Sequence, residues 1–216
     1  MLTIEYPVAF ATDFDGTVTV RDVTSMLLQE FADRRWLEIE KDFLERRITC
    51  RQALRGEFEC LRGEREELIE YVDRWARIDP HFKPFLSLCE ERGIPVRIVS
   101  EGLDFYIEHL LQKYGIEVEF FTNRAHFENG SMSVTFPNAS DKCEDCGTCK
   151  LELLKDWRDL GKKIVYAGDG LCDICPAESS DIVFAKGSLL SHFKEKGLEH
   201  LEFRNYGDII SKIRKW

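Results

Sequence analysis

Residues 8–20 read VAFATDFDGTVTV, and this short stretch is the most informative part of the chain. Its apolar half, VAFAT, has the length and composition of a buried β-strand, and it is followed by Asp13 and Asp15. In an extended chain the side chains at positions i and i+2 point the same way, so both carboxylates can face one site. Gly16 behind them lets backbone N–H groups approach a ligand. Taken alone the stretch also fits a solvated turn, but the pattern suits a hard cation such as Mg²⁺ beside an anionic group.

The second half of the chain alternates between short β-rich runs and helical stretches, which is typical of an α/β protein with a Rossmann-like parallel sheet. The residues around Asn129-Gly130 differ, because their alternating pattern predicts a β-hairpin just before a cysteine-rich loop. The predicted strands are 94–99, 118–121, 163–167, 181–185 and 200–203, and the predicted helices are 103–113, 149–160, 188–195 and 207–214.

A helical tract separates the first strand from this alternation. Thr49 and Gln52 predict a capping box that opens one helix. Asp79-Pro80 predicts the start of another helix, which Gly93 should end. We therefore expect an α/β core formed by residues 1–20 and 93–216, with residues 21–92 as a helical insertion. An insertion after the first strand lies over the carboxyl ends of the strands, where open α/β sheets bind ligands.

Two further motifs stand at predicted strand ends. The apolar run RIV leads into Ser100, Glu101 and Gly102, where a hydroxyl and a close backbone approach suit a phosphate, although a helix N-cap serine explains the same residues. The strand KIVYA leads into GDGLCD, with Asp169 and Asp173 as a second acidic pair, although a type I turn would look similar.

Lys150 begins the helical stretch that precedes KIVYA, where an ammonium group can pair with an anion, although a single lysine is usually a surface residue.

The four motifs become informative together. An acidic pair, a serine, a lysine and a second acidic pair each fall at a junction of one alternating α/β pattern. In this order the motifs DFDGT, Ser100, Lys150 and GDGLCD resemble the haloacid-dehalogenase-like phosphatases, whose helical cap is inserted where the tract 21–92 stands.

That resemblance implies a Mg²⁺-dependent phosphatase acting on a small phosphorylated metabolite. Asp13 would be the nucleophile that forms an aspartyl-phosphate, and Asp15 would act as general acid and then general base. The implied metal residues are Asp13, Asp15 through its main-chain carbonyl, Asp169 and Asp173. The implied phosphate-binding residues are Gly16, Thr17, Ser100, Glu101, Gly102 and Lys150, with Thr17 bracing the loop.

Finer features indicate a branch of the superfamily. The run SEGLDFYIEHLL and the cysteine-rich stretch before Lys150 resemble the methionine-salvage 2-hydroxy-3-keto-5-methylthiopentenyl-1-phosphate phosphatases. GDGLCDICPA is similar to a segment of the phosphocholine/phosphoethanolamine phosphatases, and phosphoserine phosphatases share the general layout. Two departures from the salvage group leave these substrates open: Glu101 replaces a glycine, and GDG replaces GDS.

The cysteine-rich loop allows several interpretations. Cys143, Cys146 and Cys149 have ligand-like spacing, and Cys172 or Cys175 lies near enough in the motif order to complete a set of four. Structural thiols or a disulfide are one reading, a structural Zn²⁺ is a second, and a redox-active centre is a third.

Composition limits the partners. The formal net charge is −10, so the surface as a whole should repel nucleic acid. No apolar run approaches the ~18 residues that span a bilayer, and the first residues lack the pattern of a signal peptide. We expect a cytoplasmic monomer or homodimer with no membrane partner.

Two alternatives from other classes remain at this point. A receiver-like phospho-acceptor also uses an acidic pair, a hydroxyl and a lysine, but it needs neither a second acidic motif nor a helical insertion. A non-catalytic metal-binding or regulatory protein on the same fold would not need all of these motif residues intact.

Overall fold

The computed structural model describes residues 7–216, and its centre is one seven-stranded sheet with the order β4-β3-β2-β1-β5-β6-β7. All neighbouring strands are parallel except β3 and β4, which form the predicted antiparallel hairpin. This confirms the predicted Rossmann-like α/β fold. The strands are β1 (Val8–Thr12), β2 (Val96–Leu103), β3 (Glu119–Glu128), β4 (Ser131–Thr135), β5 (Lys163–Gly168), β6 (Ile182–Ala185) and β7 (Leu201–Glu202).

Strand β1 lies in the middle of the sheet, between β2 and β5, and all five of its residues are buried. Ala9 and Ala11 face one apolar cluster while Phe10 faces the other, so the small apolar run serves both sides of the sheet. Because β1, β2 and β5 are parallel, their carboxyl ends meet at one edge. Three of the four predicted motifs, namely the first acidic pair, the serine and the second acidic pair, belong to these strands and lie at this edge.

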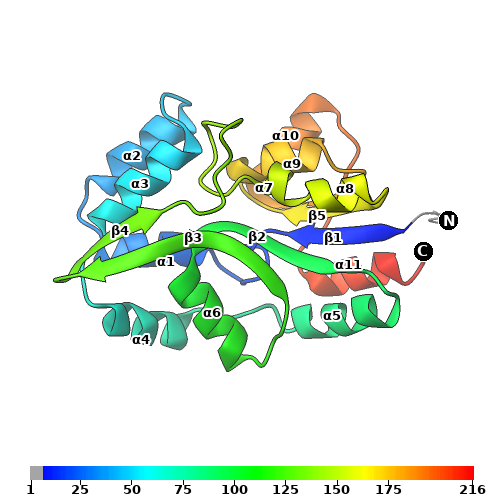
Figure 1. The fold of residues 1–216 in the computed structure, drawn as a ribbon, viewed down its shortest axis with the longest axis horizontal. Coiled ribbons are helices and arrows are strands. Elements are labelled where there is room, and N and C mark those ends of the chain that lie inside the picture. Colours follow the sequence, from blue (N-terminus) through cyan, green and yellow to red (C-terminus); the bar gives the residue numbers. More distant parts are fainter. Residues whose placement is uncertain (1–6) are drawn as a thin grey trace.

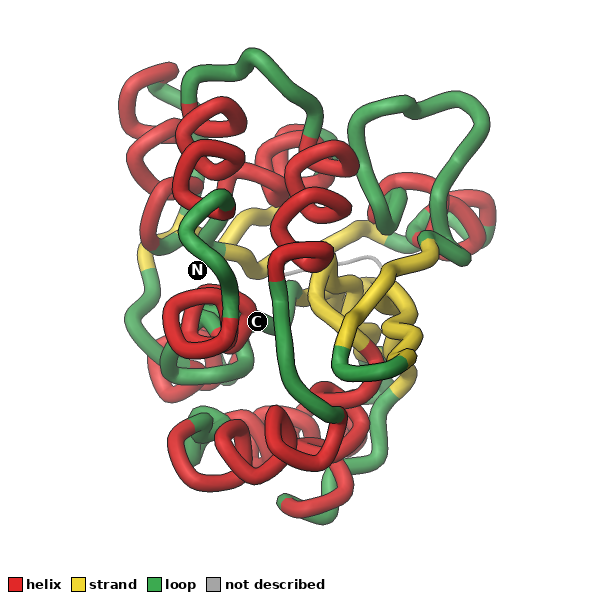
Figure 2. Tube along the Cα trace, turned by 90° about the vertical axis from the view of Figure 1, so that its left-hand side faces the viewer, coloured by secondary structure: helices red, strands yellow, loops and turns green. Residues whose placement is uncertain are grey.

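Helices cover both faces of the sheet, as Figures 1 and 2 show. One face carries α5 (Phe82–Glu91), α6 (Asp104–Lys113) and α11 (Tyr206–Ile213). The other carries α7 (Lys150–Leu153), α8 (Lys155–Asp159), α9 (Ile174–Glu178) and α10 (Gly187–Lys196). The single helix predicted over 149–160 is thus divided at Leu154. A short 3₁₀ turn, η1 (Leu171–Asp173), follows β5.

The inserted helices are α1 (Val23–Phe31), α2 (Trp36–Leu44), α3 (Cys50–Cys60) and α4 (Arg65–Trp75). Helix α2 packs on α3, and α3 contacts the hairpin strand β4, so this pair stands at the end of the sheet (Figure 1). Thr49 and Gln52 form the predicted capping box of α3.

Helix α5 lies inside the tract 21–92, yet it packs against the core. The ring centroids of Phe85 and Phe10 are 4.7 Å apart, as are those of Phe82 and Tyr206. The prediction that Asp79-Pro80 begins this helix was wrong by two residues, because the Asp79 carboxylate instead accepts bonds from the backbone N–H groups of His81 and Tyr206. The helix ends before Gly93, whose φ of +64° confirms the predicted stop.

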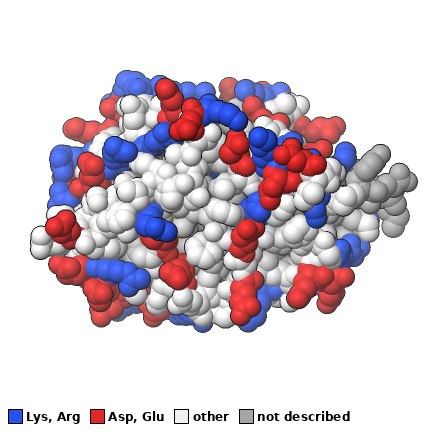
Figure 3. Space-filling model, in the orientation of Figure 1, with Lys and Arg blue, Asp and Glu red and all other residues white. Residues whose placement is uncertain are grey.

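None of the helices within residues 7–216 is long and apolar enough to cross a membrane. Acidic and basic side chains are intermingled on the face drawn in Figure 3, and no broad basic patch appears there.

Candidate active site

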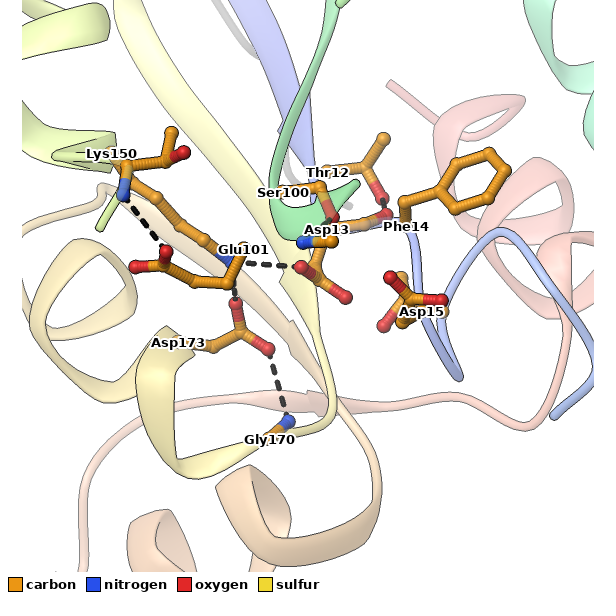
Figure 4. A network of polar contacts seen from close by, with 12 residues as sticks. Thr12, Asp13, Phe14, Asp15, Ser100, Glu101, Lys150, Gly170 and Asp173 are labelled. Atoms are coloured by element: carbon orange, nitrogen blue, oxygen red, sulfur yellow. Dashed lines mark hydrogen bonds and ion pairs between the residues drawn. The ribbon is translucent and has the colours of Figure 1, made fainter. Parts of the chain in front are cut away.

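A cleft of about 340 Å³ opens at the carboxyl edge of the sheet, between the core strands and helices α1, α2 and α3. Its core wall contains Asp13 after β1, Ser100 in β2, and Asp169 after β5, together with Lys150 at the start of α7. The fold therefore brings together the four motifs that lie up to 160 residues apart in the chain (Figure 4).

Lys150 is the centre of the polar network in this wall. Its ammonium group donates to the Asp13 carboxylate at 2.8 Å and to the Asp173 carboxylate at 2.6 Å, and the lysine is only 2% exposed (Figure 4). Burial would lower the pKa of Lys150, but the charges of Asp13 and Asp173 outweigh it and raise that pKa well above its usual value. Lys150 is therefore a permanent cation held beside the predicted nucleophile.

Asp173 fixes the shape of the GDGLCD loop. One carboxylate oxygen accepts from Lys150 and from the Tyr166 hydroxyl at 2.6 Å, and the other accepts from the backbone N–H groups of Asp169 and Gly170. With both oxygens engaged by donors, Asp173 supports the loop that presents Asp169.

Asp15 points away from Lys150, toward the inserted helices. Its carboxyl accepts from the Tyr106 hydroxyl at 2.5 Å and from the backbone N–H of Val23 at 3.1 Å. Burial raises the pKa of Asp15 to about 8, and the nearby charge of Asp22 adds to the shift. The side chain is thus a protonated acid at neutral pH, which suits a group that must donate a proton.

Asp13, Asp169 and Asp173 each place a carboxylate oxygen within 4.8 Å of the others. Burial raises the pKa of Asp13 well above its usual value, and it raises that of Asp169 to about 7, with the Asp173 charge adding to both. Three carboxyls so close together resist ionisation unless a cation joins them. An all-oxygen donor set that needs positive charge fits Mg²⁺.

Thr17 and Gly16 set the position of Asp169. The Thr17 hydroxyl donates to Asp169 at 2.7 Å, in keeping with the predicted bracing role. Gly16 has a φ of +72°, and a Cβ at that position would lie 2.6 Å from an Asp169 carboxylate oxygen. Only glycine allows the DFDGT turn and Asp169 to approach this closely.

The segment of Ser100, Glu101 and Gly102 differs from its predicted form. Strand β2 continues through it to Leu103 with a register shift after Val99, so Ser100 does not end the strand. Ser100 and Gly102 do line the cleft. Glu101 lines the cleft as well: its Oε2 accepts from the backbone N–H of Thr148 at 2.8 Å and so holds the cysteine-rich loop, while its Oε1 is buried without a hydrogen-bond partner among the described residues.

The cysteines are present as free thiols. All eight cysteines are unpaired by disulfides, and the only group of three metal-ligating side chains within residues 7–216 is the aspartate group described above. The predicted zinc or disulfide at Cys143, Cys146, Cys149, Cys172 and Cys175 is therefore not supported. The loop is held by Arg51, which donates to the carbonyls of Cys143 and Cys146 at 2.6 and 2.8 Å.

Comparison with known proteins agrees with this fold and site. The family model of the haloacid dehalogenase-like hydrolases matches residues 10–178, which include all four motifs. The chain belongs to this family. The predicted haloacid-dehalogenase-like phosphatase family is thereby confirmed, and the receiver-like alternative was wrong.

Particular relatives are similar over nearly the whole chain. A 2-hydroxy-3-keto-5-methylthiopentenyl-1-phosphate phosphatase of Bacillus velezensis is 33% identical, covering 94% of this chain and 91% of its own. One of the same name from Geobacillus kaustophilus is 32% identical, with 94% of each chain covered. A substrate-bound phosphoserine phosphatase shares the fold, with a TM-score of 0.74 at 21% identity over 97% of this chain and 99% of its own.

Sequence patterns missed two tyrosines of the site. Tyr106 lies on α6 and Tyr166 on β5, and both are fully buried with their hydroxyls on catalytic-site carboxyls. In the sequence each looks like an ordinary apolar residue of its element. Tyr106 lies in the first turn of α6, directly after the strand that contains Gly102, and a Cβ at Gly102 would collide with both the Tyr106 hydroxyl and the Asp15 carboxyl.

Proposed function

We propose that this protein is a Mg²⁺-dependent phosphatase that hydrolyses a small phosphate monoester through an aspartyl-phosphate on Asp13. One observation carries the proposal: Asp13 lies against a buried lysine, within a group of three carboxylates, and beside a second aspartate that is protonated at neutral pH. A nucleophile, a cation, a metal-binding group and an acid are the parts that this reaction needs.

The roles of the core wall follow from its geometry. Asp13 attacks phosphorus with the carboxylate oxygen that Lys150 does not hold, and the ester oxygen leaves with the proton of Asp15. Asp15, now ionised, takes a proton from the water that hydrolyses the aspartyl-phosphate. Lys150, Ser100, Thr17 and the backbone around Gly16 and Gly102 bind the phosphoryl oxygens or brace the loops that do so.

Asp13, Asp169 and the main-chain carbonyl of Asp15 would hold the Mg²⁺, with Asp173 as a further ligand or a support for Asp169. When bound, the ion neutralises carboxylate charge and stabilises the negative charge on the phosphoryl oxygens. Burial raises the pKa of Asp13 although Lys150 lowers it, so a bound divalent ion would be needed to favour the ionised carboxylate.

The inserted helices are the cap of this enzyme. Side chains of α1, α2 and α3 line the cleft opposite the core wall, so they meet the organic part of a bound ester. Within the tract 21–92, helix α5 belongs with the core because of its packing on β1 and α11. Opening and closing of the remaining helices would admit substrate and exclude water.

Two substrates are the first to test. The names of the relatives favour 2-hydroxy-3-keto-5-methylthiopentenyl-1-phosphate. An amine-bearing phosphate ester is the second, because the cap side of the cleft is acidic. The core wall would act on the phosphate group of either substrate in the same way.

The test is phosphate release from p-nitrophenyl phosphate and a panel of metabolite monoesters, with Mg²⁺ or with EDTA. Asp13→Asn should lower kcat by about 10⁴-fold or more, since it removes the nucleophile. Asp159→Asn, which changes an exposed aspartate on α8, is the matched control and should retain full activity. Absence of Mg²⁺-dependent release from every ester by folded wild-type protein would refute the proposed function.

A further inference from the structure

Glu101 is a buried carboxyl of the cleft that has no task in the proposed chemistry. It lies on the core side, opposite the cap wall that side chains of α1, α2 and α3 form, and it is only 8% exposed. Its Oε1 is the single buried side-chain oxygen or nitrogen without a hydrogen-bond partner within residues 7–216. A buried oxygen without a donor destabilises a fold, so stability alone does not explain a glutamate at this position.

The other carboxylate oxygen, Oε2, joins Glu101 to the loop that leads into α7. It accepts from the backbone N–H of Thr148 at 2.8 Å and from the side-chain amide of Asn123 at 3.2 Å. Thr148 and Asn123 are fully buried, and the Thr148 hydroxyl donates to the Asn123 side-chain oxygen at 3.1 Å. The three side chains therefore form a closed polar network that is shielded from solvent.

One end of this network is the segment that carries Ser100. The ladder between β2 and β3 shifts register in this segment, so regular strand pairing does not fix it. Side chains of β3 hold it instead. Asn123 donates to the main-chain carbonyl of Glu101 at 2.6 Å, and the Thr122 hydroxyl donates to that of Gly102 at 2.5 Å. The network thus fixes the backbone that directly follows Ser100.

The other end of the network is the start of α7. This helix has only four residues, Lys150–Leu153, so its position depends on the loop before it. The network holds Thr148, and the backbone N–H of Cys149 donates to the Asn138 carbonyl at 2.8 Å. From this start the Lys150 side chain extends to the carboxylates of the core wall (Figure 4). A displacement of Thr148 would therefore move the ammonium group.

The charge of Glu101 is not what Lys150 lacks. The lysine already has two carboxylate partners, Asp13 at 2.8 Å and Asp173 at 2.6 Å, and Glu101 gives its ammonium group no hydrogen bond. Burial also raises the pKa of Glu101, although the charge of Lys150 lowers it. The contribution of Glu101 is therefore the acceptor oxygen that it places at the loop.

We propose that Glu101 is a positioning residue, whose Oε2 fixes the loop before α7 so that Lys150 reaches Asp13. This inference rests on the proposed phosphatase function and adds a residue to its machinery. It also gives the cysteine-rich loop a task, because residues 143–149 carry the N–H group that Oε2 binds. The role requires an acceptor at the full length of a glutamate side chain, and it does not require the charge.

Two substitutions separate the length of this side chain from its charge. Glu101→Gln keeps an oxygen at the same reach, so kcat for p-nitrophenyl phosphate with Mg²⁺ should fall less than about threefold. Glu101→Asp keeps the charge but withdraws the oxygen by about 1.5 Å, the length of one C–C bond. A misplacement of this size should lower kcat about 10- to 100-fold.

Glu152→Asp is the matched control, because Glu152 lies on α7 itself but is exposed and outside the cleft. It should leave kcat within about twofold of the wild-type value. Full activity of Glu101→Asp would overturn the assignment. So would a Glu101→Gln enzyme that is as slow as Glu101→Asp, because the charge would then be what matters.

A double variant tests whether Glu101 acts through the lysine. In the Lys150→Met background the positioned group is absent, so adding Glu101→Asp should lower kcat less than about threefold further. A further loss as large as the one that Glu101→Asp causes in the wild-type background would show that Glu101 acts elsewhere, and it would overturn the assignment.

A crystal structure of Glu101→Asp gives a readout apart from activity. The start of α7 should be displaced, and the distance from the Lys150 ammonium to the Asp13 carboxylate should exceed 2.8 Å. An unchanged position of Lys150 would overturn the assignment. If Glu101→Asp does not fold, Glu101→Gln still decides, because a tenfold or larger loss of kcat in that variant contradicts the proposal.

The outcomes also separate this proposal from the proposed function. Mg²⁺-dependent phosphate release that both Glu101 variants retain in full would overturn the role of Glu101 and leave the phosphatase intact. Failure of the wild type to release phosphate from any ester, p-nitrophenyl phosphate included, would overturn both.

Discussion

The two walls of the cleft are built in opposite ways. On the core wall every carboxyl has protein donors: Asp173 accepts four hydrogen bonds, Asp15 accepts two, and Asp13 is held by Lys150. On the cap wall Glu57 has no such partner among the described residues, and Leu44 is 58% exposed. The carboxyls of the core wall are therefore held in place by protein donors and lack only a cation to offset their charge, while helix α2 on the cap wall is weakly packed and exposed to the cleft.

The elements that carry the two walls also differ in how deeply they are buried. Strand β1, which leads to Asp13, is buried along its whole length, whereas helix α2, which carries Glu40 and Leu44, contains no buried residue. Groups that stabilise a transition state act best when they are already oriented before the reaction. Side chains that select a substrate must be accessible to it. Weakly packed elements provide this access, because they open at low free-energy cost. The difference indicates chemistry in the core and selection in the cap.

After loss of the nucleophile Asp13 itself, the largest effect should come from removing the cation of the core wall. Lys150→Met leaves Asp13 and Asp173 buried without their shared partner, so we expect kcat to fall about 10³-fold. The free energy of unfolding should also fall by about 3 kcal/mol. Steady-state kinetics and urea denaturation measure the two quantities.

Lys155→Met is the control for this change. Lys155 starts the next short helix, is exposed and forms only a surface ion pair with Glu152, so its loss should alter stability by no more than about 0.5 kcal/mol. Similar behaviour of the two variants would contradict a preassembled core wall.

A smaller effect should follow from crowding Asp169. Gly16→Ala places a methyl group 2.6 Å from its carboxylate, which must then shift, and a displacement of this size should lower kcat about 10²-fold. Gly161→Ala provides a close control, because Gly161 has the same φ of +72° but no atom within 4 Å of the added Cβ. Both variants carry the strain of a left-handed alanine, about 1 kcal/mol. If their activities match, backbone strain rather than the position of Asp169 controls the reaction.

The sequence predicted the core wall far better than the cap wall, for a physical reason. Asp13, Lys150 and Asp169 stand at strand ends or helix starts, and the alternation of strands and helices fixes where those ends meet. Tyr106 and Glu57 instead lie inside helices, where a tyrosine looks like core and a glutamate looks like surface. Their roles depend on how helices pack, which the sequence pattern does not predict. Helix α5 is an example, because it lies in the predicted insertion but packs on the core.

The smallest effect should appear on the cap wall and in a different kinetic constant. Leu44 and Leu37 lie on the same helix, α2, and both are exposed, at 58% and 49%, but only Leu44 lines the cleft. Leu44→Ala removes apolar contact with the organic part of the substrate, so we expect KM to rise about threefold with kcat unchanged. Leu37→Ala should change neither constant. A fall in kcat on Leu44→Ala would place this side chain in the chemical step, and the division between a reacting core wall and a selecting cap wall would then fail at α2.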